Sequence, residues 1–394
     1  METLILEKKD EVYLTVNAEP SIQRELSEFF TFYVPGYKFM PAFRNRMWDG
    51  KIRMFSQKTK EIYFGLFPYI KSFAEERGYN VVCGEDVEIE NKVSRELVEK
   101  FSNSLGQKFE ARDYQIDAIY HSLKRNRALL VSPTASGKSF IIYSLIRYYN
   151  HLIKEESNNR ILLIVPTTSL VEQMYTDFES YGWNVKKNCH RLYSGYSNQT
   201  DKKVLISTWQ SLYKLPKSYF EQFGCVIGDE AHMFKAKSLT GIMTKLHQCK
   251  YRFGLTGTLD GSQTHKLVLE GLFGPVEKVT TTKQLIDNKS LADLKIKCIV
   301  LKHKNIRERM TYAEELQFLG EHERRNEFIA GLLMHLPGNT LCLYQLVEKH
   351  GKPLHEAVKK SQSEGFFDDK LRKVFFIYGK TSTTEREDIR SIVE

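Results

Sequence analysis

Residues 128–150 read ALLVSPTASGKSFIIYSLIRYYN, and this stretch decides how the chain folds. Its apolar start, residues 128–131, predicts a buried parallel strand, and the run from Phe140 to Ile146 predicts a packed helix. The small residues between them predict a loop whose backbone N–H groups surround a phosphate at the positive end of a helix. Lys138 is placed to reach the β- and γ-phosphates of ATP, and the Ser139 hydroxyl is placed to bind Mg²⁺. Further loop contacts with the nucleotide are expected from Pro133, Thr134, Ala135, Ser136 and Gly137.

A second motif supports this interpretation of the loop. Alone, the G-K-S tripeptide is weak evidence, and Ser132 stands where the pattern G-x-x-x-x-G-K-[ST] has its first glycine. Downstream, however, the apolar run 226–227 leads into Asp229-Glu230-Ala231-His232, so a strand delivers two carboxylates to its end. Asp229 suits coordination of the metal, and Glu230 suits orienting an attacking water as a base. His232 joins the candidate catalytic residues from its position alone.

Composition limits the class of protein. The 394 residues are 41% hydrophobic and 27% charged, which is typical of a globular chain of two or three domains. No apolar run is long enough for a membrane span and no signal peptide begins the chain, so we expect no membrane partner. Six scattered cysteines argue against a zinc site or a disulfide framework and for a cytoplasmic location. The net charge of +9 favours a polyanionic partner.

Residues 1–105 predict a small α+β domain that ends in a linking helix. Strands are expected at residues 4–6, 12–16 and 79–83, and helices at 21–29, 68–77 and 93–105. Asp49-Gly50 signals a hairpin turn, and basic residues interleave with aromatic ones around it. Candidate DNA contacts in this hairpin are Arg44, Arg46, Trp48, Lys51 and Arg53. Such a ribbon would contact phosphates and stack on bases, but a half-buried hairpin with a solvated cationic face fits equally well.

Residues 106–283 alternate apolar strand runs with helical stretches, which predicts an α/β fold. The strands are expected at residues 129–131, 161–165, 204–207, 225–227 and 251–255. This alternation predicts a parallel sheet covered by helices on both faces, with nucleotide at the carboxyl ends of the strands. Residues 284–394 restart the alternation, with strands at 296–301, 341–344 and 374–378 and helices at 312–319, 321–335 and 383–393. They predict an incomplete second sheet.

Other polar clusters lie at the ends of the predicted strands. Arg112, Tyr114 and Gln115 precede the phosphate-loop strand, and a Gln side chain can bind the N6 and N7 edge of adenine. Thr256 and Thr258 end a later strand, where they could couple the γ-phosphate to strand binding. Small hydroxyl and neighbouring residues at two more strand ends fit phosphate contacts along a nucleic-acid strand: Pro166, Thr167 and Thr208.

In this order the clusters resemble the superfamily 2 helicases. Residues 112–115 are similar to the adenine-reading Q motif, 132–139 to motif I, 166–168 to motif Ia and 207–211 to motif Ib. Asp229-Glu230-Ala231-His232 matches the DEAH form of motif II, and residues 256–258 resemble motif III. This superfamily often lacks the first glycine of motif I. The resemblance implies two RecA-like domains, of which residues 106–283 are the first.

A closer resemblance is to the UvsW helicase family of T-even bacteriophages. It covers essentially the whole chain and rests on residues 48–53, 272–275 and 291–294. It implies an ATP-driven DNA translocase that unwinds branched or duplex DNA and migrates junctions in phage recombination and repair. Phage recombination or single-strand-binding proteins are then candidate partners, and we expect a monomer in the cytoplasm of an infected bacterium.

Motifs V and VI of the family, whose glutamine and arginines complete the ATP site, do not occur before Glu394. An arginine finger contributes about 10³–10⁵ in turnover. We therefore expect residues 284–394 to be a partial second RecA-like domain, and we expect this chain alone to hydrolyse ATP and unwind DNA poorly. Two alternatives remain from the sequence: a non-motor protein that binds branched DNA in an ATP-sensitive way, and the translocase subunit of a restriction-type system.

Overall fold

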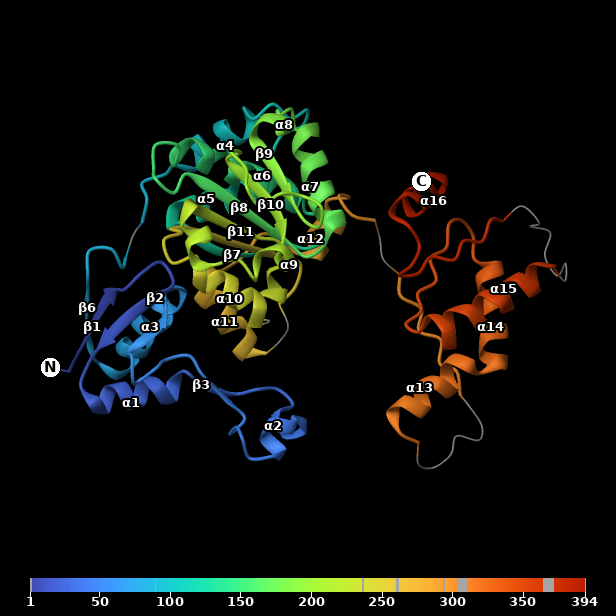
Figure 1. The fold of residues 1–394 in the computed structure, drawn as a ribbon, viewed down its shortest axis with the longest axis horizontal. Helices are drawn as coiled ribbons and strands as arrows, with labels where there is room; N and C mark the ends of the chain where they lie inside the picture. The colour runs from blue at the N-terminus through green and yellow to red at the C-terminus, as the bar shows by residue number, and fades with distance from the viewer. Residues whose placement is uncertain are drawn as a thin grey trace. The chain divides into compact units, whose positions relative to one another are not determined.

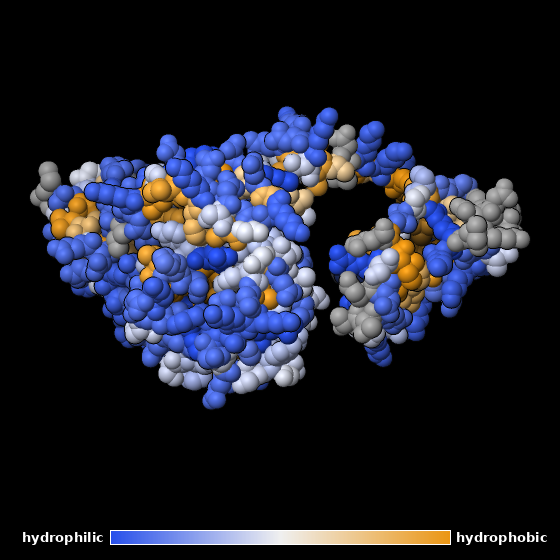
Figure 2. Space-filling view, turned by 90° about the horizontal axis from the view of Figure 1, so that it is seen from above, coloured by the Kyte–Doolittle hydropathy of each residue, from blue (hydrophilic) through white to orange (hydrophobic). Residues whose placement is uncertain are grey.

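The computed structural model describes residues 2–88, 90–235, 237–259, 262–292, 295–302, 310–363 and 372–393. The chain forms two compact units, Met1–Asp293 and Leu294–Glu394, and each is described by itself. The larger unit contains an N-terminal module and a core built on a seven-stranded sheet (Figure 1). The visible surface of this unit is mostly hydrophilic, with smaller hydrophobic patches between the polar side chains (Figure 2).

The N-terminal module packs two helices on a four-stranded sheet of order β5-β2-β1-β6. Its elements are β1 (Thr3–Lys8), β2 (Tyr13–Asn17), α1 (Pro20–Phe29), β5 (Glu61–Tyr63), η2 (Phe64–Leu66), α3 (Phe67–Arg77) and β6 (Asn80–Cys83). Alternate residues of β1 and β2, such as Leu4 and Leu14, are buried, as expected for strands with one covered face. The strands predicted at residues 4–6, 12–16 and 79–83 and the helices predicted at 21–29 and 68–77 are confirmed.

The predicted hairpin around Asp49-Gly50 is wrong. Strand β4 (Lys51–Arg53) pairs antiparallel with β3 (Thr31–Tyr33), and the residues between them carry the short helices η1 (Tyr37–Phe39) and α2 (Pro41–Arg44). Pro41 at the first position of α2 favours helix over strand. We call residues 34–50 the finger, because they form a loop closed at its base by the β3–β4 ribbon (Figure 1).

The core sheet is entirely parallel, with strand order β13-β7-β12-β11-β8-β10-β9. Its strands are β7 (Arg127–Val131), β8 (Arg160–Val165), β9 (Cys189–Leu192), β10 (Val204–Thr208), β11 (Phe223–Gly228), β12 (Tyr251–Thr256) and β13 (Val276–Lys278). The five strands predicted from apolar runs are confirmed. The edge strands β9 and β13 were not predicted.

Helices cover both faces of the core sheet (Figure 1). They are α4 (Arg95–Asn103), α5 (Asp113–Arg125), α6 (Lys138–Leu152), α7 (Thr168–Ser180), α8 (Val185–Asn188), α9 (Trp209–Leu212), η3 (Lys217–Gln222), η4 (Ala231–Lys235), α10 (Lys237–Lys245), α11 (Gln263–Phe273) and α12 (Thr282–Asp287). The sheet separates two apolar clusters, one including residues of α5, α6 and α7 and the other residues of α10 and α11. Successive strand residues face opposite clusters, so Leu129 belongs to one and Leu130 to the other.

A tight contact joins the N-terminal module to the core. A Cβ atom on Gly65 in η2 would lie 1.9 Å from the carbonyl oxygen of Glu270 in α11. Tyr69 donates to Glu270 Oε2 at 2.7 Å, and Arg127 Nη2 donates to Glu11 Oε2 at 2.6 Å. We call this contact, made by Glu11, Gly65 and Tyr69 on one side and Arg127 and Glu270 on the other, the seam. Because these groups are largely buried, the seam makes the module part of the same compact unit as the core.

The smaller unit is helical in its described residues. It contains α13 (Tyr312–Glu321), α14 (Glu323–His335), the π-turn η5 (Val347–Gly351), α15 (Lys352–Ser363) and α16 (Thr383–Val393). The helices predicted at residues 312–319, 321–335 and 383–393 are confirmed, whereas α15 was not predicted.

The three strands predicted at residues 296–301, 341–344 and 374–378 are wrong, because none of these described residues belongs to a strand. Tyr344 stacks on Phe376 at 5.3 Å and donates to the Ile377 carbonyl, so two of the segments meet through side chains. A strand requires a ladder of backbone hydrogen bonds, and apolar residues such as Leu341 and Leu343 remain exposed here.

Candidate nucleotide and DNA sites

The strands of the core sheet end in polar residues at one edge. Thr256 pairs in register with Val131, Gly228 pairs with Gly254 and Ile164, and Thr208 pairs with Val165. Because all of these strands are parallel, the segments that follow them emerge on the same side. The predicted gathering of the motifs at the carboxyl edge of a parallel sheet is confirmed. We call this side the nucleotide edge.

The phosphate loop, residues 132–139, has the backbone of an anion cradle. Ala135 and Gly137 adopt left-handed conformations with φ of 65° and 78°, and α6 begins directly at Lys138. Ser132 Oγ and Ser136 Oγ lie 2.6 Å apart, and Ser136 Oγ also donates to the Pro133 carbonyl. The serine in place of the first glycine therefore has a structural role, because it braces the loop from within.

Lys138 meets the acidic motif across this loop. Its Nζ lies 3.1 Å from Glu230 Oε1, and His232 Nδ1 lies 3.3 Å from Glu230 Oε2 and 3.0 Å from Thr256 Oγ1. Thr256 Oγ1 in turn donates to the Thr258 carbonyl at 2.9 Å. A continuous polar chain thus runs from the phosphate loop through the acidic motif to the end of β12. Five residues singled out in three parts of the sequence are brought together.

Asp229 occupies the most buried position of the acidic motif, with 4% of its surface exposed. Burial raises the pKa of its carboxyl group, Lys138 opposes this shift, and the charge of Glu230 adds to it. Its Oδ1 atom has no hydrogen-bond partner among the described residues. Since a buried carboxylate oxygen is costly to leave unpaired, this atom fits a ligand that the polypeptide itself does not supply.

The residues at this edge fit a magnesium ion carried by a nucleotide. Mg²⁺ usually keeps several waters and takes one or two protein oxygens besides phosphate oxygens. Asp229 Oδ1 is a suitable ligand. No cluster of three His, Cys, Asp or Glu side chains that could hold a metal occurs among the described residues. Ser139 Oγ, the second predicted ligand, lies 3.0 Å from the hydroxyl of Tyr181.

The residues before β7 support the phosphate loop from behind. Gln115 is buried, its Nε2 donates to the Ser136 carbonyl at 2.9 Å, and its Oε1 accepts from the Arg112 backbone at 3.0 Å. The Tyr114 hydroxyl also donates to the Ser136 carbonyl and accepts from Arg112 Nη1. A Cβ atom on Gly137 would lie 2.4 Å from Gln115 Nε2, so this position needs glycine. Adenine recognition by Gln115 stays a prediction.

The predicted strand-end contacts with DNA have local roles in the fold. Thr167 caps α7 by accepting from the Leu170 backbone at 3.3 Å, with Pro166 before it at the end of β8. Thr208 is buried, and its hydroxyl lies 3.2 Å from Ser211 Oγ. Contacts of these residues with DNA stay predictions.

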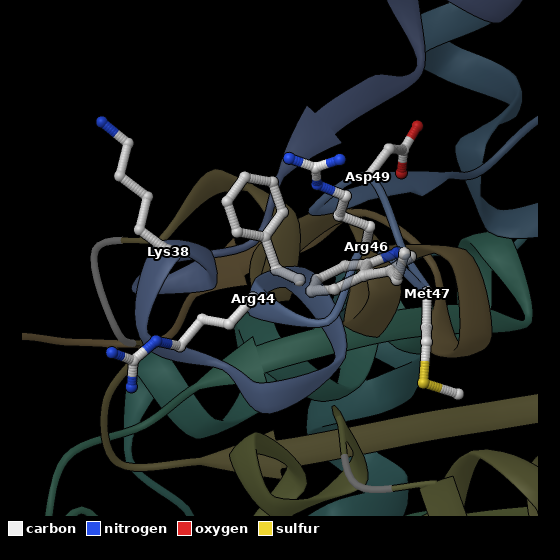
Figure 3. A pocket seen from close by; sticks show the side chains of 7 residues that line it. Lys38, Arg44, Arg46, Met47 and Asp49 are labelled. Carbon is white, nitrogen blue, oxygen red and sulfur yellow. The ribbon is translucent and has the colours of Figure 1, made fainter.

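The finger carries three of the five DNA contacts predicted in the N-terminal domain, Arg44, Arg46 and Trp48. A shallow depression of about 610 Å³ on it is lined by Lys38, Phe43, Arg44, Arg46, Met47, Trp48 and Asp49. The side chains of Lys38, Arg44 and Arg46 extend from the backbone of the finger in different directions, and the side chain of Met47 points away from those of Lys38 and Arg44 (Figure 3).

Contacts with the β3–β4 ribbon close the base of the finger. Trp48 Nε1 donates to the Lys51 carbonyl at 2.9 Å, so the indole ring holds the finger closed. Arg53 pairs with Asp49, and Lys51 lies over the Tyr33 ring at 4.9 Å.

Two features of the nucleotide edge were not found in the sequence. Tyr181, which meets Ser139, follows α7 in an aromatic stretch that gives no sign of a polar role. The hydrogen bond from Gln115 to Ser136 joins residues 21 positions apart, and only the fold brings them together.

In the described part of the chain, no helix has both the length and the apolar composition that crossing a membrane requires.

Family models match two parts of the chain. Residues 4–84 match the N-terminal region of DNA helicase UvsW, and residues 108–261 match the res subunit of type III restriction enzymes. Among curated proteins, the ATP-dependent DNA helicase uvsW of Enterobacteria phage T4 is 31% identical over 97% of this chain and 76% of its own length. The DNA 3'-5' translocase XPB2 of Sulfurisphaera tokodaii is 25% identical over 57% of this chain and 46% of its own length.

Solved structures agree with the sequence matches. One crystal structure of the UvsW helicase from bacteriophage T4 aligns with a TM-score of 0.64 and 33% identity over 70% of this chain and 99% of that chain. A second crystal structure of T4 UvsW aligns with a TM-score of 0.65 and 28% identity over 99% of this chain and 77% of that chain.

Proposed function

Since this chain belongs to the UvsW family of ATP-dependent DNA helicases, we propose that it acts on branched DNA during phage recombination and repair. The core sheet and its phosphate loop are the ATP-binding part of the motor. We take residues 1–105 as the DNA-binding domain, 106–283 as the first RecA-like domain and 284–394 as part of the second. Phage recombination or single-strand-binding proteins remain candidate partners of a monomer in the cytoplasm of an infected bacterium.

The proposed ATP chemistry rests on the contact between Lys138 and Glu230. Lys138 is placed to bind the β- and γ-phosphates of ATP, and Asp229 and Ser139 would hold a Mg²⁺ ion, which would supply positive charge to neutralise the phosphates. A phosphate next to Lys138 competes with the Glu230 carboxylate, 3.1 Å from Nζ, for the ammonium group. Glu230 is then released to orient the attacking water, and His232 and Thr256 connect this change to the end of β12.

DNA contacts are assigned to two surfaces. Arg44, Arg46, Lys51 and Arg53 of the finger and its ribbon provide phosphate contacts, and Thr167 and Thr208 lie where the strands of the core end. A motor of this kind moves along DNA only if both surfaces are linked to the ATP site. The compact packing of the N-terminal module on the core supports such a link.

The proposal is tested by ATP turnover with and without a branched DNA, in the intact chain and in Lys138→Ala. We expect DNA to stimulate a turnover that is low in this chain alone, and the variant to lose that turnover by about 10²–10³-fold, as for loss of one charge-stabilising donor. Lys154→Ala, an exposed lysine, is the matched control and should behave as the unmodified chain. If ATP changes the affinity for branched DNA but is not hydrolysed, the ATP-sensitive binding protein replaces the motor.

A further inference from the structure

The finger has a small aromatic core of its own. Tyr37 stacks on Tyr33 at 4.7 Å and meets Phe43 edge-on at 4.7 Å. A Cβ atom on Gly50 would lie 2.3 Å from the Tyr37 ring, so the backbone packs directly against the aromatic group. The backbone of Val34 donates to the Gly50 carbonyl at 2.9 Å and closes the base. The finger is therefore a built element with its own packing.

Two large apolar side chains of the finger are more than three-quarters exposed. Phe39 is 84% exposed and Met47 is 80% exposed, although the neighbouring Tyr37 and Phe43 are packed. The backbone fixes both positions: Phe39 N donates to the Gly36 carbonyl, and Met47 N donates to the Ala42 carbonyl, each at 2.9 Å. Arg46, just before Met47, is held in a left-handed conformation with φ of 57°. Non-glycine residues adopt this conformation at a cost, and it concentrates at functional positions.

The surroundings of these two side chains are strongly basic. Residues 34–53 contain five basic side chains, Lys38, Arg44, Arg46, Lys51 and Arg53, against the single carboxylate of Asp49. That carboxylate is already engaged by Arg53. This combination of exposed apolar side chains and cations calls for an anionic partner that also offers apolar faces. It suits DNA, which offers phosphates to the cations and flat base faces to the apolar groups.

The base of the finger is carried by a module that is fixed to the core. Buried contacts of the seam, such as that between Tyr69 and Glu270, hold the module against α11. Helix α11 is the next element in the chain after β12. Thr256, the last residue of β12, is hydrogen-bonded to His232 of the acidic motif. An element that separates base pairs under force has to be attached rigidly to the motor, because a mobile element would be displaced before the base pairs open.

We propose that Phe39 and Met47 form a wedge that stacks on the exposed base pair at a DNA branch point, while Lys38, Arg44 and Arg46 bind the flanking phosphates. This inference rests on the proposed function and names the element that selects its substrate. Inserting apolar side chains between stacked bases costs unstacking energy in a continuous duplex. At a branch point the last base pair is already unstacked on one side, so the wedge favours branched over linear DNA.

The test compares the double variant Phe39→Ala/Met47→Ala with the unmodified chain on two DNAs of equal length, a three-way junction and a linear duplex. A 2-aminopurine placed at the branch point reports stacking by its fluorescence. We expect about tenfold weaker junction binding, the size of one lost base–aromatic stack, with unchanged duplex binding and loss of the fluorescence change. Leu97→Ala in α4, which is 64% exposed, is the control for removing an exposed apolar side chain.

A second variant separates the wedge from the phosphate contacts. Arg44→Ala/Arg46→Ala should weaken junction and duplex binding alike and reduce the salt dependence of both, because phosphate contacts carry no branch information. If the wedge variant loses both DNAs equally, or keeps its junction preference and fluorescence change, the wedge is refuted. A change in the sedimentation coefficient of the chain caused by the wedge variant would also refute it, since the tip would then be a protein interface.

These outcomes are distinct from failure of the proposed function. Turnover in the unmodified chain that is low but rises with DNA keeps the motor, whereas turnover that does not respond to DNA at all would reject it. Normal stimulation by linear DNA in the wedge variant, together with lost junction preference, supports both proposals. Thermal unfolding of the wedge variant should match that of the unmodified chain, because both side chains are exposed.

Discussion

At the nucleotide edge the buried carboxylate of Asp229 has an oxygen without a partner among the described residues, whereas at the seam the buried carboxylate of Glu270 has both oxygens engaged. Strained backbone conformations also occur at the nucleotide edge. Ala135 and Glu230 at the nucleotide edge adopt left-handed conformations with φ of 65° and 49°. The two buried carboxylates therefore differ within one compact unit: Asp229 keeps an oxygen for a ligand, and Glu270 uses both oxygens where two modules are held together, although Arg127 Nη1 at the seam also has no partner among the described residues.

The largest effect that would test this contrast concerns activity alone. Glu230→Gln should lower the ATPase rate about 10³-fold, or about 4 kcal/mol of barrier, because the amide cannot act as a base toward water. The free energy of unfolding should stay nearly constant, since Glu230 is partly exposed and its ion pair with Lys138 is replaceable by solvent. Steady-state turnover and chemical denaturation measure the two quantities. Glu155→Gln, at an exposed site, is the control, and a turnover within tenfold of the unmodified rate would contradict the assignment.

At the seam the expected effect is on stability. Glu11→Gln should lower the free energy of unfolding by about 3 kcal/mol, because the Arg127 guanidinium would remain buried without its counter-ion. Denaturant titration measures this change. The exposed pair of Lys71 and Glu88 provides the control, since Glu88→Gln should cost less than about 1 kcal/mol.

The pH dependence of the Glu11 variant follows from its carboxyl group. Burial opposes ionisation of Glu11, but Arg127 and Lys8 outweigh it and hold its pKa below the usual value. The ion pair therefore stabilises the fold above the pKa of the unfolded carboxyl, about 4.3, and this stabilisation is lost as pH falls further. The difference between Glu11→Gln and the unmodified chain should shrink below that pH. A difference that grows on acidification would show that the ion pair is not its source.

A smaller loss is expected from the tyrosine of the seam. Tyr69→Phe removes the hydroxyl that donates to Glu270 at 2.7 Å and leaves a buried carboxylate oxygen unpaired, which costs about 2 kcal/mol. The free energy of unfolding from denaturant titration measures this loss. Tyr79→Phe is closely matched, because the Tyr79 hydroxyl donates to Glu25 at 3.1 Å on the exposed surface. Equal losses in the two variants would mean that burial does not distinguish the seam.

The smallest effect should have the opposite sign. Asp229→Asn removes a buried charge with an unpaired oxygen, so it should raise the stability of the nucleotide-free protein by about 1 kcal/mol at pH 7. Because burial raises the pKa of the Asp229 carboxyl, ionisation costs folding free energy at neutral pH, and that cost disappears as pH falls and the carboxyl protonates. The gain should therefore vanish in acid, while stabilisation by Mg²⁺–ATP in thermal unfolding is lost. A less stable asparagine variant would place Asp229 among the structural residues.

The sequence predicted the centre of the core sheet better than its margins. Strands such as β7 and β8 are continuous apolar runs, because both of their faces are buried. The edge strand β9, Cys189-His190-Arg191-Leu192, is half polar, and β13 has only three residues, so neither shows that signal. In the smaller unit the apolar segments at residues 296–301 and 341–344 satisfied the strand pattern but not the requirement for a hydrogen-bonded neighbour.

The same division holds for the sites. The phosphate loop and the acidic motif were predicted, because each is a local pattern imposed by phosphate chemistry. The finger was mistaken for a two-residue hairpin, because Asp49-Gly50 marks a turn without telling which strand precedes it. The register is set instead by β3, many residues earlier, and by the Pro41 helix start between the strands. Contacts such as Gln115 with Ser136 depend on the whole fold and have no local signature.

The close approach of Gly65 to the Glu270 carbonyl has a practical consequence for anyone who dissects this protein. A fragment that begins at the boundary suggested by the motifs, near residue 105, would lack the N-terminal module. The side of α11 that packs against Gly65 would then be exposed. The excised fragment would then present apolar residues such as Leu267 to water. A fragment meant to remain in solution should instead begin at the first strand and stop near residue 293.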